Sequence, residues 1–198
     1  MERDQYSPIV ICTRHSLLSA AGLRARLASN MATPPKGQSI ELKLARLADA
    51  QRIALMSRDL VEAGLPWSWT STRVAQHIRG HDSDVLTAWA NGQLVGFAIM
   101  QFFAEHAHLN LLAVEPGCRQ AGVGRQLIEW LEETARAGGI FFVNLEVRAG
   151  NGGAQAFYRK LGYKETKILP HYYSSRETAM CMTHDLRRGV LPTLPDDQ

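Results

Sequence analysis

One short segment of the chain combines closely spaced glycines with arginines at the point where a helix is expected to begin. It consists of Arg119, Gln120, Ala121, Gly122, Val123, Gly124 and Arg125. Glycine has no side chain, so the backbone can approach a ligand closely and turn its free N–H groups outward. The N-terminus of a helix adds about half a positive charge, and the two arginines add whole charges. These features suit the segment to binding phosphate.

The residues on either side predict the elements that hold this segment. Leu109–Val114 reads as a short buried strand, which Glu115–Gly117 ends with turn-forming residues. Apolar residues then recur at helical spacing, so a helix is expected from Gly122 to Ala137. A dinucleotide-binding loop needs a third glycine and a later acidic residue, and a P-loop needs Gly-Lys-Ser/Thr, so both are excluded. Taken alone, the segment is equally compatible with a tight strand–helix turn that binds nothing.

A second pattern follows in the last third of the chain. It reads Asn151-x-x-Ala154-x-x-Phe157-Tyr158-x-x-x-Gly162-Tyr163. Together with the Arg-x-x-Gly-x-Gly spacing of the first segment, it resembles the signature motifs of the GNAT superfamily of N-acetyltransferases. More narrowly, Leu65–Ser68, Leu145–Arg148 and His171–Tyr173 resemble segments of the bacterial ribosomal-protein alanine N-acetyltransferases. The resemblance covers roughly residues 40 to 186.

This resemblance implies an α/β fold, in which a central mixed sheet is splayed between two parallel strands and flanked by helices. It also implies acetyl-CoA as co-substrate, with its pyrophosphate held by the glycine-containing segment. The backbone of Leu112, Ala113 and Val114 would then bind the acetyl carbonyl and the pantetheine amides, because the splayed strand leaves its own groups unpaired. Asn151 is similar to the residue that contacts the pantetheine arm, and it is equally a good N-cap for the following helix.

Glu146 is the candidate general base for acetyl transfer to an amine. Alternation in the expected strand 140–147 puts Phe142, Asn144 and Glu146 on one face. Burying an unpaired carboxylate there would be costly, so an open cleft is expected beside it. In the resembled subfamily this glutamate is the proposed base and acts through water. The alternative is a rim glutamate that pairs with Arg148 or another cation.

Tyr158 is the candidate acid, on the helix that follows Asn151. Its usual pKa of about 10 exceeds the value of about 8.5 for a thiol, so proton donation to a departing thiolate is mildly uphill. A hydrogen bond that strengthens as charge develops on sulfur would still lower the barrier. The alternative is a core tyrosine in the apolar stripe formed with Ala154, Phe157 and Leu161.

The expected acceptor is the α-amino group of a peptide or protein N-terminus, in a groove lined by Trp67 and Tyr172. An α-amine, with a pKa of about 8, is partly neutral near pH 7, whereas a lysine with a pKa of about 10.4 is almost entirely charged. Trp67 and its neighbour Trp69 are equally compatible with ordinary loop packing. Two rival functions stay open: acetylation of a small-molecule amine, and a non-catalytic module that binds acyl-CoA.

Composition argues against several other classes of function. The chain has 198 residues and a net charge of +3, with no long basic block, so nucleic-acid binding is not expected. No apolar run approaches the roughly 20 residues of a membrane span. Three scattered cysteines, Cys12, Cys118 and Cys181, indicate reduced thiols and a cytoplasmic protein. Cys118 lacks an adjacent histidine that would suggest a nucleophile. His106 and His108 share a strand face but lack a third ligand, so no metal is expected.

Three parts are expected along the chain. Residues 1–38 form an acid-poor accessory segment and linker with a helix at 16–29, a composition also typical of an organelle transit peptide. Residues 39–188 form the acetyltransferase domain, and residues 189–198 form a flexible tail. Within the domain we expect helices at 47–63, 71–79 and 152–161, and strands at 40–44, 84–90, 93–103, 140–147, 163–169 and 177–185. The pair Asn91-Gly92 indicates a tight hairpin. A monomer or a homodimer would suit such a domain.

Overall fold

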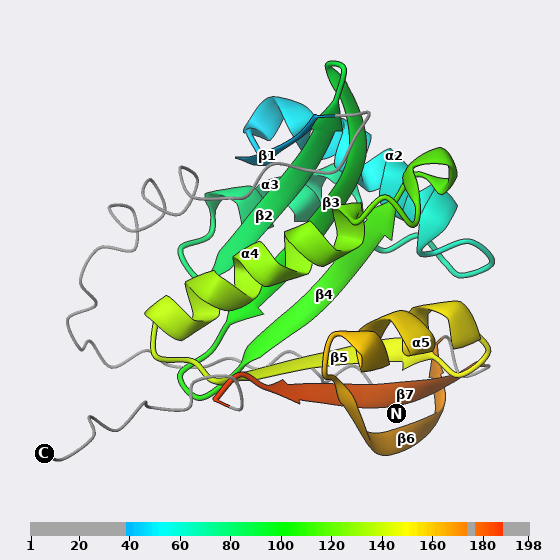
Figure 1. The fold of residues 1–198 in the computed structure, drawn as a ribbon. Coiled ribbons are helices and arrows are strands. Elements are labelled where there is room, and N and C mark those ends of the chain that lie inside the picture. Colours follow the sequence, from blue (N-terminus) through cyan, green and yellow to red (C-terminus); the bar gives the residue numbers. More distant parts are fainter. Residues whose placement is uncertain (1–38, 174–176, 188–198) are drawn as a thin grey trace, which may run out of the picture.

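The computed structural model describes residues 39–173 and 177–187, which form one seven-stranded mixed sheet with helices on both faces (Figure 1). The expected helix at 16–29 and the expected tail lie outside the described residues. The strand order is β1-β2-β3-β4-β5-β7-β6. The α/β architecture expected from the sequence is confirmed.

The described elements agree closely with the expected ones. The strands are β1 Ile40–Leu44, β2 Ser83–Ala90, β3 Gln93–Phe102, β4 Ala107–Val114, β5 Phe142–Arg148, β6 Lys164–Tyr173 and β7 Glu177–Asp185. The helices are α2 Ala50–Leu60, α3 Ser71–Arg79, α4 Val123–Ala137 and α5 Gly152–Lys160, with short 3-10 turns at Leu47–Asp49 and Pro116–Cys118. Each of these described helices is too short or too polar to cross a bilayer.

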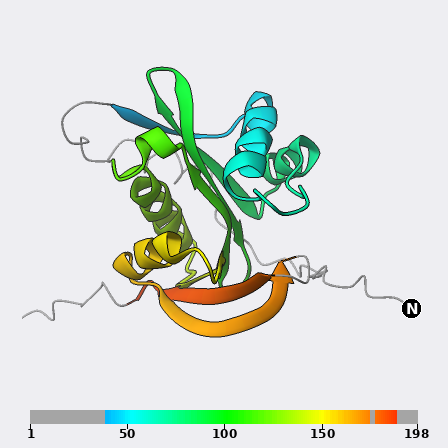
Figure 2. The same cartoon turned by 90° about the vertical axis from the view of Figure 1, so that its right-hand side faces the viewer.

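Helices cover both faces of the sheet (Figure 2), and a hydrophobic cluster packs them against each face. On the face of the sheet covered by α4, one buried cluster includes Leu127, Leu131, Met100 and Leu109, and α5 also contributes to it. The opposite face packs α2 and α3 on a second cluster of residues, Ile53, Val74, Val85, Phe97, Ile99 and Leu111 among them. Two helical layers therefore enclose the sheet, as expected for an α/β domain.

The sheet is continuous in its first four strands and opens between β4 and β5. Strands β1 to β4 pair antiparallel, and the Asn91-Gly92 hairpin has φ angles of 51° and 75°, which the tight turn requires. The parallel ladder of β4 and β5 contains only Ala107 with Val143 and His108 with Asn144. Beyond these pairs the two strands diverge (Figure 1). The expected splay between two parallel strands is therefore confirmed.

A buried carboxylate connects the helix α4 to the C-terminal strands. Glu132 is 4% exposed, and its Oε1 lies 2.9 Å from both the hydroxyl of Tyr163 and Nδ1 of His184. The ring of His184 packs so closely under Gly162 that a Cβ there would lie 2.7 Å from Nε2. Burial and the negative charge of Glu132 hold the pKa of Tyr163 well above its usual value. This cluster ties the part of the sheet beyond the splay to α4.

Two boundaries differ from the expected ones for physical reasons. The helix expected at 47–63 ends at Leu60, because the N–H groups of Val61 and Glu62 both bond to the carbonyl of Ser57 and the chain turns away. The strand expected at 163–169 continues to Tyr173 despite Pro170. This strand lies at the edge of the sheet, where proline needs no ladder partner for its missing N–H.

Candidate active site

The glycine-containing segment forms an exposed loop that turns into the N-terminus of α4. Gly122 is the N-cap of α4 with φ of 82°, a left-handed conformation that glycine adopts without strain, and Gln120 has φ of 62°. No side chain caps this end of the helix. The first N–H groups of α4 therefore point out of the helix without intrahelical acceptors, which is the arrangement that binds an anion.

The two arginines of this loop already have partners within the protein. Arg119 donates from Nε to the carbonyl of Val114 at 3.2 Å, and Arg125 pairs with Glu129 at 2.7 Å. Gly124 lies close to α5, since a Cβ there would lie 3.3 Å from Cζ of Phe157. The loop thus joins the end of β4 to both helices of this face.

Between the loop and the splay, β4 has hydrogen-bond partners on one edge only. Leu112, Ala113 and Val114 pair with β3, whereas their other edge faces the divergence from β5. Within the part of the chain that the structure describes, the ladder with β5 ends at His108. The backbone groups expected to bind acetyl and pantetheine therefore line an open edge, as the sequence predicts.

Glu146 lies on β5 close to the start of this divergence and faces a histidine of β4. Its Oε2 is 3.0 Å from Nε2 of His108, and the two side chains are 21% and 24% exposed. Burial, followed by the charge of Glu146 and a hydrogen bond to it, raises the pKa of Tyr172. Cys181, the β7 neighbour of Glu146, also has a raised pKa, caused first by burial and then by this carboxylate. The carboxylate is thus partly open to solvent and bounded by three polar side chains.

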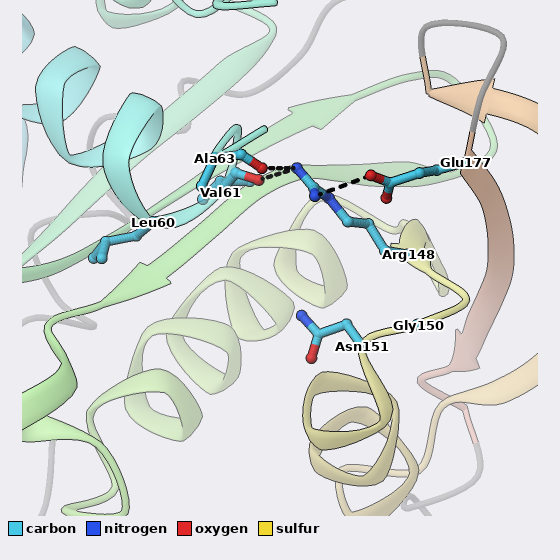
Figure 3. Close-up of a pocket in the computed structure, with 7 residues that line it drawn as sticks. All are labelled: Leu60, Val61, Ala63, Arg148, Gly150, Asn151 and Glu177. Carbon is cyan, nitrogen blue, oxygen red and sulfur yellow. Dashed lines mark hydrogen bonds and ion pairs between the residues drawn. The ribbon is translucent and has the colours of Figure 1, made fainter. Parts of the chain in front are cut away.

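Arg148, the alternative partner considered for Glu146, forms a set of contacts with the segment that follows α2. Its guanidinium reaches across to the α2 end, donating to the carbonyls of Val61 and Ala63 at 2.9 and 3.0 Å, and lies 3.5 Å from Glu177 (Figure 3). These contacts tie β5 and β7 to the loop that follows α2.

A pocket of about 400 Å³ opens beside these contacts (Figure 3). It is lined by Leu60, Val61, Ala63, Arg148, Gly150, Asn151 and Glu177. Asn151 also caps α5, since its Oδ1 accepts from the N–H of Ala154 at 3.0 Å. The pocket therefore lies between the start of α5, near the splay, and the loop after α2.

Tyr158 lies on the opposite side of β5 from Glu146. It is 8% exposed, and its ring packs edge-on against Phe157 and Tyr163 at 5.2 and 5.5 Å. It belongs to the same cluster as Leu145 and Val147, the neighbours of Glu146 that point to the helix face. Glu146 and Tyr158 can therefore meet a common ligand only where the strands separate.

The two tryptophans after α2 have different roles. Trp67 is 40% exposed and donates from Nε1 to the carbonyl of Trp69, whereas Trp69 is 7% exposed and lies in the α2–α3 core. Glu62, 7% exposed, accepts hydrogen bonds from the backbone N–H of Ser68 and Trp69 and from the Ser68 hydroxyl. A buried carboxylate thus fixes the loop that presents Trp67.

The sequence analysis missed two of these residues. His108 was weighed only as a metal ligand beside His106, but His106 precedes β4 and stacks on Phe103 at 4.8 Å. Across 39–173 and 177–187, no three His, Cys, Asp or Glu side chains are grouped to hold a metal ion. The signal for His108 was its place on the strand expected to neighbour that of Glu146. Glu62 had no comparable signal, because its partners follow from the path of the loop.

Comparison with known proteins finds N-acetyltransferases among the relatives of this chain. An N-alpha-acetyltransferase of Sulfurisphaera tokodaii is 27% identical over 167 residues, 76% of this chain and 96% of the relative. The ribosomal protein bS18-alanine N-acetyltransferase of Escherichia coli K12 is 39% identical over 95 residues, 46% of this chain and 64% of the relative.

Solved structures show the same fold. The crystal structure of the ribosomal-protein-S18-alanine N-acetyltransferase from Escherichia coli matches with a TM-score of 0.66 and 28% identity, covering 78% of this chain and 98% of that one. The PaiA N-acetyltransferase from Thermoplasma acidophilum, solved in complex with coenzyme A, matches with a TM-score of 0.63 and 22% identity over 74% of this chain and 99% of that one.

The family model of the acetyltransferase (GNAT) family matches residues 54–163, from α2 through the glycine-containing loop and α5 to the residue before β6. This range is more than half of the chain and contains Glu146 and Tyr158. The protein is therefore an acyltransferase that belongs to the GNAT family of N-acetyltransferases.

Proposed function

We propose that this enzyme transfers the acetyl group of acetyl-CoA to the α-amino group of a peptide or protein N-terminus. The observation that carries the proposal is the position of Glu146, partly exposed and paired with His108 where β4 and β5 begin to diverge. The N-terminus of α4, with its free backbone N–H groups, follows the C-terminal end of β4. A thioester arm held along this open edge would end beside the carboxylate.

In this proposal the bound co-substrate supplies an activated acetyl thioester, and the chain supplies binding and proton transfer. The loop at Gly122 holds the pyrophosphate. The open edge of Leu112–Val114 binds the acetyl carbonyl and the pantetheine amides, and the side chain of Asn151 contacts the pantetheine arm. Glu146 accepts the proton of the acceptor amine through water, assisted by its contact with His108. Tyr158 donates a proton to the departing thiolate, a transfer that is mildly uphill for an ordinary tyrosine, whose usual pKa of about 10 exceeds the value of about 8.5 for a thiol.

The acceptor assignment rests on proton affinity and on the shape of the outer face. Neutralising a lysine near pH 7 requires roughly 3–4 kcal/mol more than neutralising an α-amine, at 1.36 kcal/mol for each unit of pKa. A single partly solvated carboxylate suits the easier task. Trp67 and Tyr172 are 40% and 49% exposed, as expected of side chains that line an open peptide groove. Named relatives acetylate protein N-termini, which supports the same choice. The scattered thiols favour the cytoplasm as its location.

Three matched peptides test the proposal: one with free N-terminal alanine and no lysine, one α-blocked with lysine, and one with both features. Acetylation is followed by mass spectrometry with Glu146→Gln as the control for enzyme-dependent turnover. We expect modification of the free α-amine. Preferential modification of the α-blocked peptide, or turnover of small amines only, would favour the rival metabolite acetyltransferase. Tight acetyl-CoA binding without turnover of any amine would indicate a non-catalytic module.

A further inference from the structure

Asn110 occupies an irregular position in β4 at the start of the splay. Met100 of β3 pairs with Leu109, and Ile99, the residue before Met100, pairs with Leu111. Asn110 is therefore an extra residue in a β-bulge. The bulge reverses the alternation of the strand, because Leu109 packs on the α4 face while Leu111 packs on the α2–α3 face. Bulges commonly re-aim a side chain beside an active site.

The side-chain amide of Asn110 is also unusual in its hydrogen bonding. Its Nδ2 is buried and, among the described residues, has no hydrogen-bond partner. Asn144, which lies on the adjacent strand, shows the ordinary situation, since its Oδ1 accepts from the hydroxyl of Thr183 at 2.6 Å. An unpaired buried donor destabilises a fold. A bound ligand that accepts a hydrogen bond from this donor would explain why it is kept.

The position of Asn110 along β4 indicates which part of a ligand it would meet. His108, which contacts the proposed base, lies two residues before it, and Leu112, the first residue proposed to bind the pantetheine arm, lies two residues after it. Each step of two residues spans roughly 7 Å of strand. The thioester lies between the acceptor amine and pantetheine, so its carbonyl is expected beside Asn110.

We infer that Asn110 adds a side-chain donor to the backbone donors of Leu112–Val114: its Nδ2 donates a hydrogen bond to the carbonyl oxygen of the bound acetyl thioester and stabilises the negative charge that develops there. This inference rests on the proposed function. During transfer the amine nitrogen forms a bond to the carbonyl carbon, the C–S bond breaks, and its electron pair leaves with sulfur. Glu146 receives the amine proton and Tyr158 protonates the thiolate, while Asn110 gains and loses no proton. Donors of this kind act because they are fixed before the charge appears.

The test is Asn110→Leu, which keeps the branched shape of the side chain and removes the donor. We expect kcat with a peptide to fall by about 10²–10³-fold, as when one oxyanion donor is removed. Affinity for CoA, which has no acetyl carbonyl, should stay at the wild-type value. The melting temperature should be unchanged or higher, because an unpaired buried donor has been removed. The control, Asn144→Leu, should lower the melting temperature, since it leaves the hydroxyl of Thr183 without its acceptor.

The outcomes separate this inference from the proposed function. A folded Asn110→Leu enzyme with wild-type kcat would overturn the role of Asn110 and leave the proposed reaction intact. A fall in melting temperature with a parallel loss of CoA affinity would show a structural asparagine and also overturn it. If the leucine does not fit, Asn110→Ala provides the same comparison without added bulk, and misfolding of both variants would again contradict the inference. A wild-type enzyme that acetylates no amine would overturn both proposals.

Discussion

The imidazole of His108 and the carboxylate of Glu146 lie 3.0 Å apart on two parallel strands, next to the last ladder pair that joins those strands. One partner comes from each side of the splay. The contact therefore forms only when β4 and β5 are in register. It also gives the carboxylate a neighbour that can hold its orientation while its remaining lone pairs stay available to water.

Glu146→Gln should lower kcat at pH 7 by about 10²–10⁴-fold, the usual contribution of a general base. The residual rate should rise with pH through about 8, because the α-amine of the acceptor then loses its proton unaided. Stopped-flow or mass-spectrometric rates between pH 6 and 9 measure this, with acetyl-CoA affinity as the control for folding. Wild-type kcat across that range would remove Glu146 from the mechanism.

Tyr158→Phe should slow turnover with a smaller dependence on pH than Glu146→Gln. The substitution keeps the ring that packs on Phe157 and Tyr163, so thermal stability should change little. An activated thioester analogue with a better leaving group should recover much of the lost rate, because it no longer needs an acid. Equal defects with both thioesters would show that Tyr158 acts only through packing.

Gly122→Asp should weaken acetyl-CoA binding far more than Gly122→Asn. Both side chains are good N-caps and tolerate the left-handed conformation, and a Cβ at Gly122 has no neighbour closer than 3.7 Å. The pair therefore differs mainly in charge, and like charges about 4 Å apart near a protein surface repel by about 4 kcal/mol. Calorimetry should show a loss of about 100-fold or more for Asp alone. Similar affinities for the two variants would argue against pyrophosphate at this loop.

Glu62→Ala should raise KM for the peptide without changing acetyl-CoA affinity. It removes the acceptor of three hydrogen-bond donors in the loop that presents Trp67. Leaving such donors unpaired costs about 1–3 kcal/mol, so stability should also fall. Asp59→Asn, at an exposed ion pair in the last turn of α2, serves as the control with little expected effect. An unchanged KM would separate this loop from the acceptor groove.

Wild-type stability should decline above about pH 10 more steeply than that of Tyr163→Phe. Burial and Glu132 raise the pKa of Tyr163 in the folded state. Between the unfolded value of about 10 and the raised folded value, unfolding releases a proton, so the free energy of unfolding falls as pH rises. Urea denaturation from pH 8 to 11 measures both slopes. Parallel slopes would mean that Tyr163 does not carry this dependence.

Much of the fold could be predicted from local signals in the sequence. The hairpin at Asn91-Gly92, the helix from Val123 and the cap at Asn151 each depend on residues next to one another in the chain. The strand containing Pro170 was predicted too short, because its length depends on its place at the sheet edge. That place follows from the strand order and has no local signature.

The candidate site was predictable where a motif names the residue and unpredictable where two distant segments meet. The glycine-containing loop, Glu146 and Tyr158 follow from motifs. The partner of Glu146 does not, since His108 reaches it across strands separated by the whole of α4. Glu62 and the bulge at Asn110 were likewise invisible, because loop path and strand register decide them.

The brevity of the ladder between β4 and β5 has a mechanical consequence. Two residue pairs between β4 and β5 join strands β1–β4 to strands β5–β7. These pairs are therefore the pivot when the two parts of the sheet rotate relative to one another. A small rotation displaces the far end of β4, near Val114, much more than it displaces His108 and Glu146. We therefore expect that the two parts of the sheet can widen to admit a long, bulky ligand while the separation of His108 and Glu146 stays nearly constant.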